Sequence, residues 1–325
     1  MADGPTRPTA PTAQPDSETV TRIVRASRAQ VQGSAMERLF AARQRVRGAG
    51  AIPGLCGAVL HVGGWYVLWQ EGPPAAIEAA LRPSRRSALH EPPRLVHRST
   101  GPRTLREALA ISTTQWAEAP EQFERRIEAL RQVAADVQPA EIWRALSEPC
   151  NLGPVGDVPR GHCWVGLLAS DDQSSIEIAR RLAERCRRPL VYRRFADGEP
   201  GSNDVGTAYF DVAFRGRKLR VQAVARRAFG HELVHHSLRT PDRVALLVGD
   251  KARHAMELAT GVVEFLRRAT GAPRVDLVAG DAGVRSSVGD FLRAHLPAGV
   301  TQREPVGDLE LMNLLFGPMP EAGLA

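Results

Sequence analysis

A glycine-framed segment near the start of the chain leaves few folds open to it. Apolar residues with high β propensity run over 55–62, Gly63-Gly64 is a two-residue hairpin signal, and a second β-forming run covers 65–69. Residues 71–73, Glu-Gly-Pro, should then end the strand, and apolar residues recur at helical spacing over 74–81. The segment therefore predicts a strand, a tight turn, a second strand and a helix that crosses the sheet.

The flanking segments extend this order of elements to roughly residues 18–115. Together with the central hairpin, residues 22–29, 36–45 and 94–101 resemble the first strand, first helix and fourth strand of the BLUF family, which are flavin-binding blue-light sensors. The resemblance implies an α+β ferredoxin-like domain and a role in signalling.

The resemblance also implies which positions would serve a flavin. In BLUF sensors a tyrosine on the first strand donates an electron to the excited flavin, a glutamine on the third strand rearranges its hydrogen bonds, and an asparagine anchors the ring. Here the tyrosine position is Arg25, the glutamine position is Leu68, and residues 36–54 contain no asparagine. Arginine is no electron donor and leucine has no amide, and Gln70 lies two residues further along the same strand face. We therefore expect no cofactor, with FAD as the alternative.

The basic composition invites an interpretation as a nucleic-acid-binding protein. The formal net charge is +7, and Lys218 and Lys251 are the only lysines among 43 basic residues, so arginines dominate. These arginines are spread through both halves, and the densest cluster, over 180–188, belongs to a segment whose other helical face is apolar. We expect a solvated or partner-facing surface there and no nucleic-acid partner.

Other sequence features indicate a bacterial-type cytoplasmic protein. No apolar run reaches the ~18 residues of a membrane span, and the first residues do not form a signal peptide. We therefore expect no membrane partner. Cys56, Cys150, Cys163 and Cys186 are widely spaced and are expected to be buried thiols.

Composition shifts divide the chain into segments. A Pro-rich tail that we expect to be disordered covers 1–17, and the BLUF-like domain covers 18–115. A helical extension over 116–148, broken at Pro139, and a Pro/Gly-rich linker over 149–160 follow. The second domain then covers 161–317 and a short tail 318–325.

The second domain alternates strands and helices. Predicted strands cover 163–169, 243–249 and 274–279, a hairpin covers 207–224, and helices lie between them. This order predicts an α/β three-layer domain with a mostly parallel sheet and one antiparallel edge strand. One hairpin early in an alternating domain resembles a Ras-like small GTPase.

The nucleotide motifs that the GTPase resemblance implies are missing. The segment aligned with the phosphate loop, 169–175, has no glycine or lysine and contains two aspartates. The magnesium-linked motif aligns with 225–228 and the guanine-reading motif with 280–283, and neither keeps its functional residues. The resemblance therefore implies a P-loop-less pseudo-GTPase domain.

A His-Glu-x-x-His motif offers a competing chemistry. In a zinc peptidase, His231 and His235 would bind the metal, Glu232 would act as general base, and Glu257 or Glu264 would supply a third ligand. The motif has room for only a short helix before Pro241, so we favour a structural or partner-contact role.

These observations predict a non-catalytic regulatory, adaptor or assembly protein that acts through protein–protein contacts. Its partner would be another protein or a second copy of this chain. The alternatives are a divergent flavin-binding blue-light photoreceptor and a zinc-dependent hydrolase that uses the motif at Glu232.

Overall fold

The computed structural model describes residues 18–30, 34–48, 50–84, 90–132, 137–149, 152, 162–170, 174–196, 205–237, 239, 241–267, 273–296 and 299–317. The expected tails, nearly all of the expected linker, Cys150 and residues 171–173 of the phosphate-loop equivalent lie outside these ranges.

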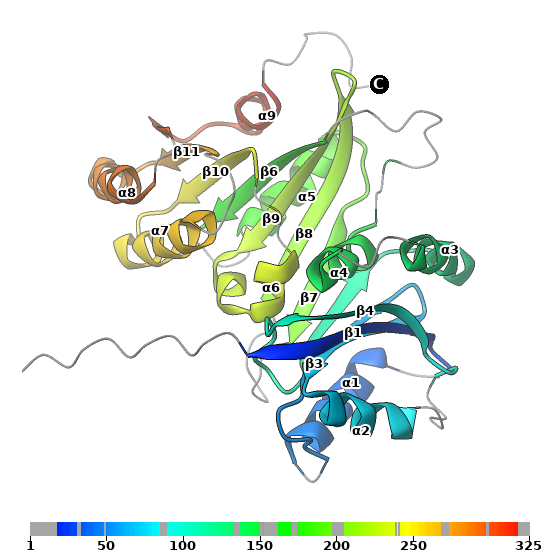
Figure 1. The fold of residues 1–325 in the computed structure, drawn as a ribbon. Coiled ribbons are helices and arrows are strands. Elements are labelled where there is room, and N and C mark those ends of the chain that lie inside the picture. Colours follow the sequence, from blue (N-terminus) through cyan, green and yellow to red (C-terminus); the bar gives the residue numbers. More distant parts are fainter. Residues whose placement is uncertain are drawn as a thin grey trace, which may run out of the picture.

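Strands and helices alternate along most of the chain (Figure 1). The strands are β1 (Thr19–Arg28), β2 (Cys56–Val62), β3 (Trp65–Gly72), β4 (Arg94–Pro102), β5 (Ala110–Gln115), β6 (His162–Ala169), β7 (Val191–Ala196), β8 (Val205–Phe214), β9 (Arg217–Ala225), β10 (Arg243–Val248), β11 (Arg274–Ala279) and β12 (Val300–Arg303). The helices are α1 (Ala35–Arg47), α2 (Pro74–Ser84), α3 (Pro120–Arg131), α4 (Pro139–Ser147), α5 (Ser174–Arg185), α6 (Glu232–Ser237), α7 (Ala252–Arg267), α8 (Ala282–His295) and α9 (Asp308–Phe316), and a 3-10 turn η1 (Arg226–Gly230) precedes α6.

Within the described residues, all 12 strands form one mixed sheet in the order β12-β11-β10-β6-β9-β8-β7-β5-β2-β3-β1-β4. Strands β12, β11, β10, β6 and β9 run parallel to one another, and β8 is antiparallel to β9. The two halves of the chain meet where β5 pairs antiparallel with β7, from Ile111 opposite Ala196 to Gln115 opposite Tyr192. The sheet is therefore continuous through the expected domain boundary.

This continuity corrects the sequence prediction in two respects. The antiparallel strand β8 is not an edge strand, because β7 pairs with its outer side. The expectation of two separate sheets is not confirmed, because β7 joins the N-terminal strands. The sequence interpretation missed β5, β7 and β12, and the β7 segment carries Arg193 and Arg194 in place of a continuous apolar run.

The N-terminal elements lie where the sequence placed them. Gly63 and Gly64 have φ of 55° and 75°, which is the backbone of a tight hairpin turn that glycine adopts without strain. Strand β3 continues to Gly72, three residues beyond the expected end, and α2 begins after Pro73. The hairpin, its helix and the flanking elements β1, α1 and β4 are thus confirmed as local structure.

The two faces of the N-terminal sheet are covered by different helices (Figure 1). Trp65, Val67 and Trp69 are buried against α3 and α4, in a cluster with Phe123 and Trp143. Helix α1 covers part of the opposite face, where the smaller apolar cluster includes Leu39, Val59 and Ile111. Because side chains alternate along a strand, Tyr66, Leu68 and Gln70 of β3 point to the α1 face.

Helices also cover both faces of the C-terminal half. Helices α7 and α8 contribute to the larger apolar cluster, whereas α5 and α9 pack on the other side with residues of β6, β8 and β9. Among the described residues, no helix is both long and apolar enough to span a membrane. The described cysteines Cys56, Cys163 and Cys186 are free thiols.

Candidate functional site

A pocket of about 440 Å³ lies between α1 and the sheet of the N-terminal half. This volume is within the range of small-molecule sites. It is lined by Arg25, Ser27, Arg38, Leu39, Ala42, Arg45, Val46, Leu55, Gly57, Val59, Tyr66, Leu68, Gln70, Ala80, His90, Pro93, Ala108 and Leu109. Apolar side chains thus form most of the wall, and a few polar groups converge on the cavity.

The pocket contains the two positions that the flavin resemblance singled out. Arg25 of β1 lies directly opposite Leu68 of β3, and the Arg25 Nη2 atom donates a hydrogen bond of 2.6 Å to the Oε1 atom of Gln70. Arg25 is 5% exposed, and burial lowers the pKa of its guanidinium to about 10. Arg25 also lines a smaller cavity of about 280 Å³, in which the facing Glu78 pairs with Arg98.

Basic residues also stand at the α1 side of this pocket. Arg38 is half-buried and Arg45 is exposed. Burial raises the pKa of the Tyr66 hydroxyl, and the charge of Arg38 opposes that shift. Among the described residues that line the pocket, none carries a carboxylate. The lining therefore has an excess of positive charge.

The two positions aligned with the BLUF tyrosine and glutamine do not carry the residues that flavin photochemistry uses there. The Gln70 amide oxygen, the nearest substitute for the missing glutamine, already accepts a hydrogen bond from Arg25. Leu68 presents no polar atom to the pocket. The structure thus retains a cavity at the α1 face in which the two BLUF positions carry Arg25 and Leu68, and in which Tyr66 and Gln70 line the wall from other positions of β3.

The pocket shares one wall with a loop that follows β4. Ala108 and Leu109 line the cavity. Earlier in the same loop, Thr104 is hydrogen-bonded to Glu71 of β3. The Glu71 carboxylate accepts hydrogen bonds from the Thr104 amide at 2.6 Å, the Thr104 hydroxyl at 2.7 Å and the Leu105 amide at 2.8 Å. This fully buried carboxylate fixes the start of the loop.

Helix α6 of the C-terminal half holds the next part of the same loop. Its Glu232 carboxylate accepts hydrogen bonds from the backbone amides of Arg106 at 2.5 Å and Glu107 at 3.2 Å. Burial raises the pKa of Glu232, while these two hydrogen bonds oppose the shift. Its His236 also touches the loop through a hydrogen bond with the Thr104 backbone, and its ring lies 5.1 Å from that of Trp69. The segment 104–107 is thus bound by carboxylates from both halves.

The His-Glu-x-x-His residues therefore have structural partners. His231 precedes α6, so the motif does not place its two histidines on one helix face. The His231 Nδ1 atom accepts a hydrogen bond from the Leu233 amide at 3.2 Å, which leaves Nε2 to donate to the Ala196 carbonyl at 3.2 Å. Glu232 binds the loop described above, and His235 is half-buried.

Glu257, one of the two residues expected as a third zinc ligand, is also engaged elsewhere. Glu257 pairs with Arg226 at 2.5 Å and with Arg253 at 2.9 Å. Across the described parts of the chain, no three His, Cys, Asp or Glu side chains come together as a metal site. No observation therefore supports the zinc-hydrolase alternative.

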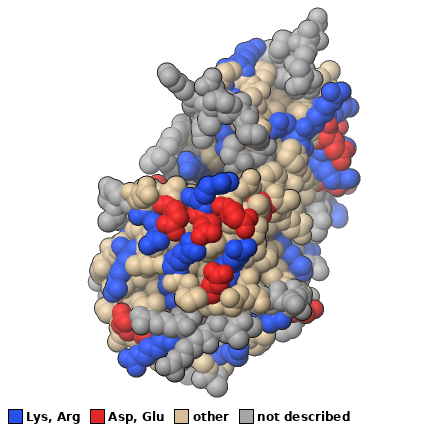
Figure 2. Space-filling model, turned by 90° about the vertical axis from the view of Figure 1, so that its right-hand side faces the viewer, with Lys and Arg blue, Asp and Glu red and all other residues tan. Residues whose placement is uncertain are grey.

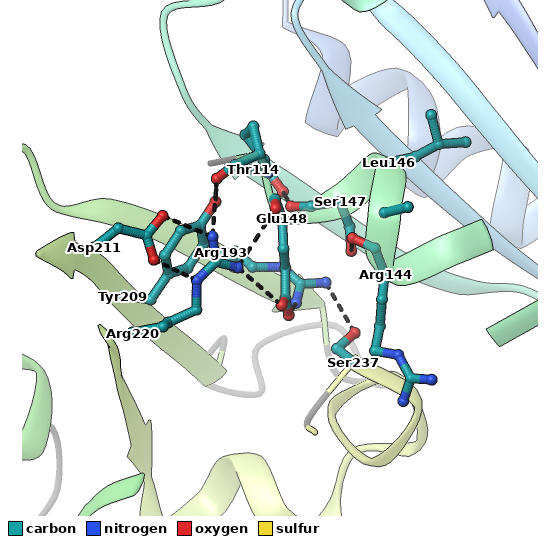
Figure 3. Close-up of polar contacts among 12 residues, drawn as sticks. Thr114, Arg144, Leu146, Ser147, Glu148, Arg193, Tyr209, Asp211, Arg220 and Ser237 are labelled. Carbon is teal, nitrogen blue, oxygen red and sulfur yellow. Dashed lines mark hydrogen bonds and ion pairs between the residues drawn. The ribbon is translucent and has the colours of Figure 1, made fainter. Parts of the chain in front are cut away.

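A second polar cluster lies at the junction of the two halves (Figure 3). Glu148, just after α4, pairs with Arg193 of β7 at 2.6 Å and with Arg220 of β9 at 3.3 Å. Arg220 makes a bidentate contact with Asp211 of β8 at 2.6 and 2.8 Å. Arg193 also donates to the Ser237 hydroxyl at the end of α6 at 2.9 Å. One network thus connects α4, the central strands and α6.

This junction network is almost completely buried. The side chains of Arg193, Glu148, Arg220 and Asp211 are 0%, 3%, 3% and 0% exposed. Burial lowers the pKa of Arg193, although Glu148 opposes the shift. Burial acts in the same direction on Arg220, but the hydrogen bonds and charge of Asp211 outweigh it, so the pKa of Arg220 is raised. The cluster is a set of buried ion pairs, in which Lys218 also lies 3.6 Å from Asp211.

The outer surface of the N-terminal half carries both signs of charge. Figure 2 shows arginines and carboxylates interleaved on that face of the molecule. Ion pairs on and beside α3 include Arg94 with Glu124 at 2.5 Å and Arg28 with Glu121 at 3.2 Å. Among the described residues on the face seen in Figure 2, arginines and carboxylates are therefore mixed.

Comparisons with known proteins give only distant similarities. No protein-family model matches the sequence, and a search of curated proteins found no match. Among solved structures, the chain is similar to a BlrP1 BLUF structure at 17% identity and a TM-score of 0.25, over 30% of this chain and 66% of that chain. It is similar to the dark state of BlrB, a BLUF protein, at 16% identity and a TM-score of 0.27, over 41% and 95% of the two chains.

A third similar structure is the cytosolic domain of the T. maritima FeoB iron transporter in a GDP form, at 13% identity and a TM-score of 0.27. The match covers 47% of this chain and 62% of that chain.

Sequence reasoning missed most of the polar residues that organise the site. Glu71 was interpreted as part of a strand break, whereas it lies inside β3. Glu148, Asp211 and Arg220 were not singled out. The sequence did contain one signal for these residues. A charged residue within an otherwise apolar strand, such as Asp211, indicates a buried charge that needs a partner.

Proposed function

We propose that this protein is a non-catalytic regulator that binds a small molecule in the α1 pocket and acts through contacts with another protein. The observation that carries the proposal is the shared loop after β4. Ala108 and Leu109 line the pocket, while the amides of Arg106 and Glu107 are bound by Glu232 of α6. A ligand that displaces the pocket wall would therefore strain the contact with the C-terminal half.

A second set of hydrogen bonds also connects the pocket helix α1 with α6 of the C-terminal half. Arg43 on the buried face of α1 donates a hydrogen bond of 3.2 Å to the Ala196 carbonyl, and His231 donates to that same carbonyl. Helix α1 supplies several pocket residues, among them Leu39. Movement of α1 on ligand binding would thus change the hydrogen bonds at the Ala196 carbonyl, at the end of β7 and next to the start of α6.

The C-terminal half is proposed as the output part of this regulator. Its strand order, β8-β9-β6-β10-β11-β12 with β8 antiparallel, supports the interpretation as a small-GTPase-like domain. Within that interpretation, the segment around α6 lies where such domains change shape. The missing nucleotide motifs favour a contact role, in which a partner protein or a second copy of this chain recognises the state of α6.

Hydrogen–deuterium exchange tests the proposal. The fluorescent probe anilinonaphthalene sulfonate should bind the pocket and change amide protection in residues 103–109 and in α6, compared with the ligand-free protein. In Leu68→Trp, where the larger side chain fills the cavity, the probe should change neither segment. Probe binding that alters 103–109 but leaves α6 unchanged would remove the proposed link between the halves.

The visible absorption spectrum separates this proposal from the photoreceptor alternative. We expect purified protein to lack a flavin band. Stoichiometric bound flavin with a light-induced spectral change would replace the proposed ligand-binding regulator by a divergent blue-light sensor.

A further inference from the structure

We infer that the protein partner that contacts the region of α6 is acidic, and that it places a carboxylate between Arg144 of α4 and Arg239, which follows the end of α6 at Ser237. This inference rests on the proposed function, in which another protein recognises the state of α6, and it specifies the chemistry of that contact.

Arg144 is the first of the two positive charges at this place. Helix α4 packs against α6, and Figure 3 shows the Arg144 side chain apart from the ion pairs of the junction network. Its own ion pair, with Glu141 one turn earlier on α4, is long at 3.9 Å. The Arg144 Nε atom is buried and has no hydrogen-bond partner among the described residues. Arg144 is thus a half-buried guanidinium that is only weakly paired.

Arg239 supplies the second positive charge. It is exposed, and its Cζ atom lies 5.1 Å from the centre of the Trp164 ring. Among the residues that the structure describes, no carboxylate pairs with Arg239. Burial lowers the pKa of Arg144, and the charge of Arg239 adds to this shift, while Glu141 and Glu148 oppose it. The two guanidinium groups therefore repel each other, and a carboxylate between them would relieve the repulsion.

The space beside these residues favours a protein over a small molecule as the ligand. Trp164 and Arg239 also line a cavity of about 20 Å³, which has room for about one water molecule and not for the body of a small ligand. A ligand would therefore lie on the surface, where a protein can add contacts around the two arginines. Arginine and tryptophan are also enriched among the residues that contribute most to protein–protein binding.

Carboxylates around the two arginines favour an acidic protein segment over a nucleic acid. Glu141 is exposed, and so is Asp242, which accepts a hydrogen bond from the Trp164 amide at 2.8 Å. A phosphate backbone carries a charge on every unit, so both carboxylates would repel it. A peptide can instead present a carboxylate to the arginines and neutral side chains to Glu141 and Asp242.

Two labelled peptides of equal length test the inference. In the first, glutamate alternates with serine, and in the second, glutamine replaces each glutamate. Fluorescence anisotropy with the full chain should show that the Glu–Ser peptide binds more tightly. Arg144→Gln and Arg239→Gln should each weaken its binding about threefold or more and leave the affinity for the Gln–Ser peptide nearly unchanged. Circular dichroism checks that both variants fold.

Two controls address general charge effects and the class of partner. Arg253→Gln removes an equal charge from the exposed side of α7 and should change neither affinity. No loss in the Arg144 and Arg239 variants, or an equal loss in the Arg253 variant, would overturn the inference. Single-stranded oligothymidylate of similar charge should be affected less than the Glu–Ser peptide by the first two substitutions. An equal or larger loss would favour a nucleic acid as the partner and would also overturn the inference.

A further titration separates this inference from the proposed function. Neutral phenylnaphthylamine in the α1 pocket should change the affinity for the Glu–Ser peptide, because the pocket wall and α6 share the loop after β4. If the peptide depends on both arginines but not on phenylnaphthylamine, the acidic partner remains and the link from the pocket to α6 fails. If phenylnaphthylamine alters amide protection in α6 but neither arginine affects the peptide, the regulator remains and the acidic partner is wrong.

Discussion

The buried arginines of the junction and of the pocket have different partners. At the junction, Arg220 is held by the carboxylate of Asp211 in a bidentate contact, and Arg193 by that of Glu148. In the pocket, Arg25 lines the cavity and donates a hydrogen bond to the neutral amide of Gln70. A buried charge costs free energy unless it is paired, so the two sites suggest different roles. We therefore expect the ion pairs of the junction to contribute more to the stability of the fold than the hydrogen bond between Arg25 and Gln70.

Removing a carboxylate from the junction tests most strongly whether the two sites differ in their contribution to stability. We expect Asp211→Asn to lower the free energy of unfolding by about 3–5 kcal/mol, because it leaves the buried Arg220 without its closest counter-charge. Chemical denaturation measures this loss. The matched control is Asp290→Asn, in the exposed i,i+3 pair with Arg293, which should cost less than about 1 kcal/mol. Losses of similar size in both variants would mean that the junction is no more than another surface ion pair.

The loop that joins the two sites should give the next largest effect. Glu71→Gln weakens an acceptor that serves the Thr104 amide, the Thr104 hydroxyl and the Leu105 amide. We expect a loss of about 1–3 kcal/mol in the free energy of unfolding and faster amide exchange over 103–109. Glu78→Gln on the exposed face of α2 is the control and should leave that exchange unchanged. Unchanged protection of the loop in Glu71→Gln would show that Glu71 does not hold it.

Much of the local structure could be predicted from the sequence, because it depends on short-range signals. The Gly63-Gly64 turn and the spacing of apolar residues fixed the first hairpin and its helix. The long-range pairing of β5 with β7 left no such signal, since both segments are short and the paired residues are 77 to 85 positions apart in the sequence. One continuous sheet in place of two followed from that missed pairing.

The site was predicted less completely than the fold, for a related reason. The sequence identified Arg25 and Leu68 as the positions where BLUF sensors carry their functional residues. It did not show that the two lie opposite each other on β1 and β3 and line a pocket together with residues of α1. The motif at Glu232 suggested a metal because its spacing was judged as if it were a helix face. Tertiary structure instead starts α6 after His231 and uses Glu232 to bind backbone amides.

The stability of the contact between His236 of α6 and the loop after β4 should depend on pH. Burial lowers the pKa of His236, with Glu71 and the Thr104 backbone opposing the shift and His235 and Arg144 adding to it. A lowered pKa means that the folded state prefers the neutral ring. The contribution of His236 is therefore present above its unfolded pKa of about 6.5 and is lost as pH falls through the lower folded value.

Denaturation between pH 7 and pH 5 measures this contribution. We expect wild-type stability to fall over that interval and the fall to be smaller in His236→Gln, which cannot gain a proton. If both proteins have the same slope, the His236 ring is not held in its neutral form by the contact with Trp69 and the loop.

The smallest expected effect on stability is the most informative about the pocket. Arg25→Gln removes a guanidinium whose burial lowers its pKa to about 10, and it keeps a polar group that can bond to Gln70. The lost hydrogen bond and the relieved desolvation act in opposite directions, so we expect the free energy of unfolding to change by less than about 1 kcal/mol. Denaturation in parallel with Asp211→Asn compares the two sites directly. A loss from Arg25→Gln as large as the junction loss would make Arg25 a structural residue, whereas near-neutral stability would show that the fold does not depend on its charge.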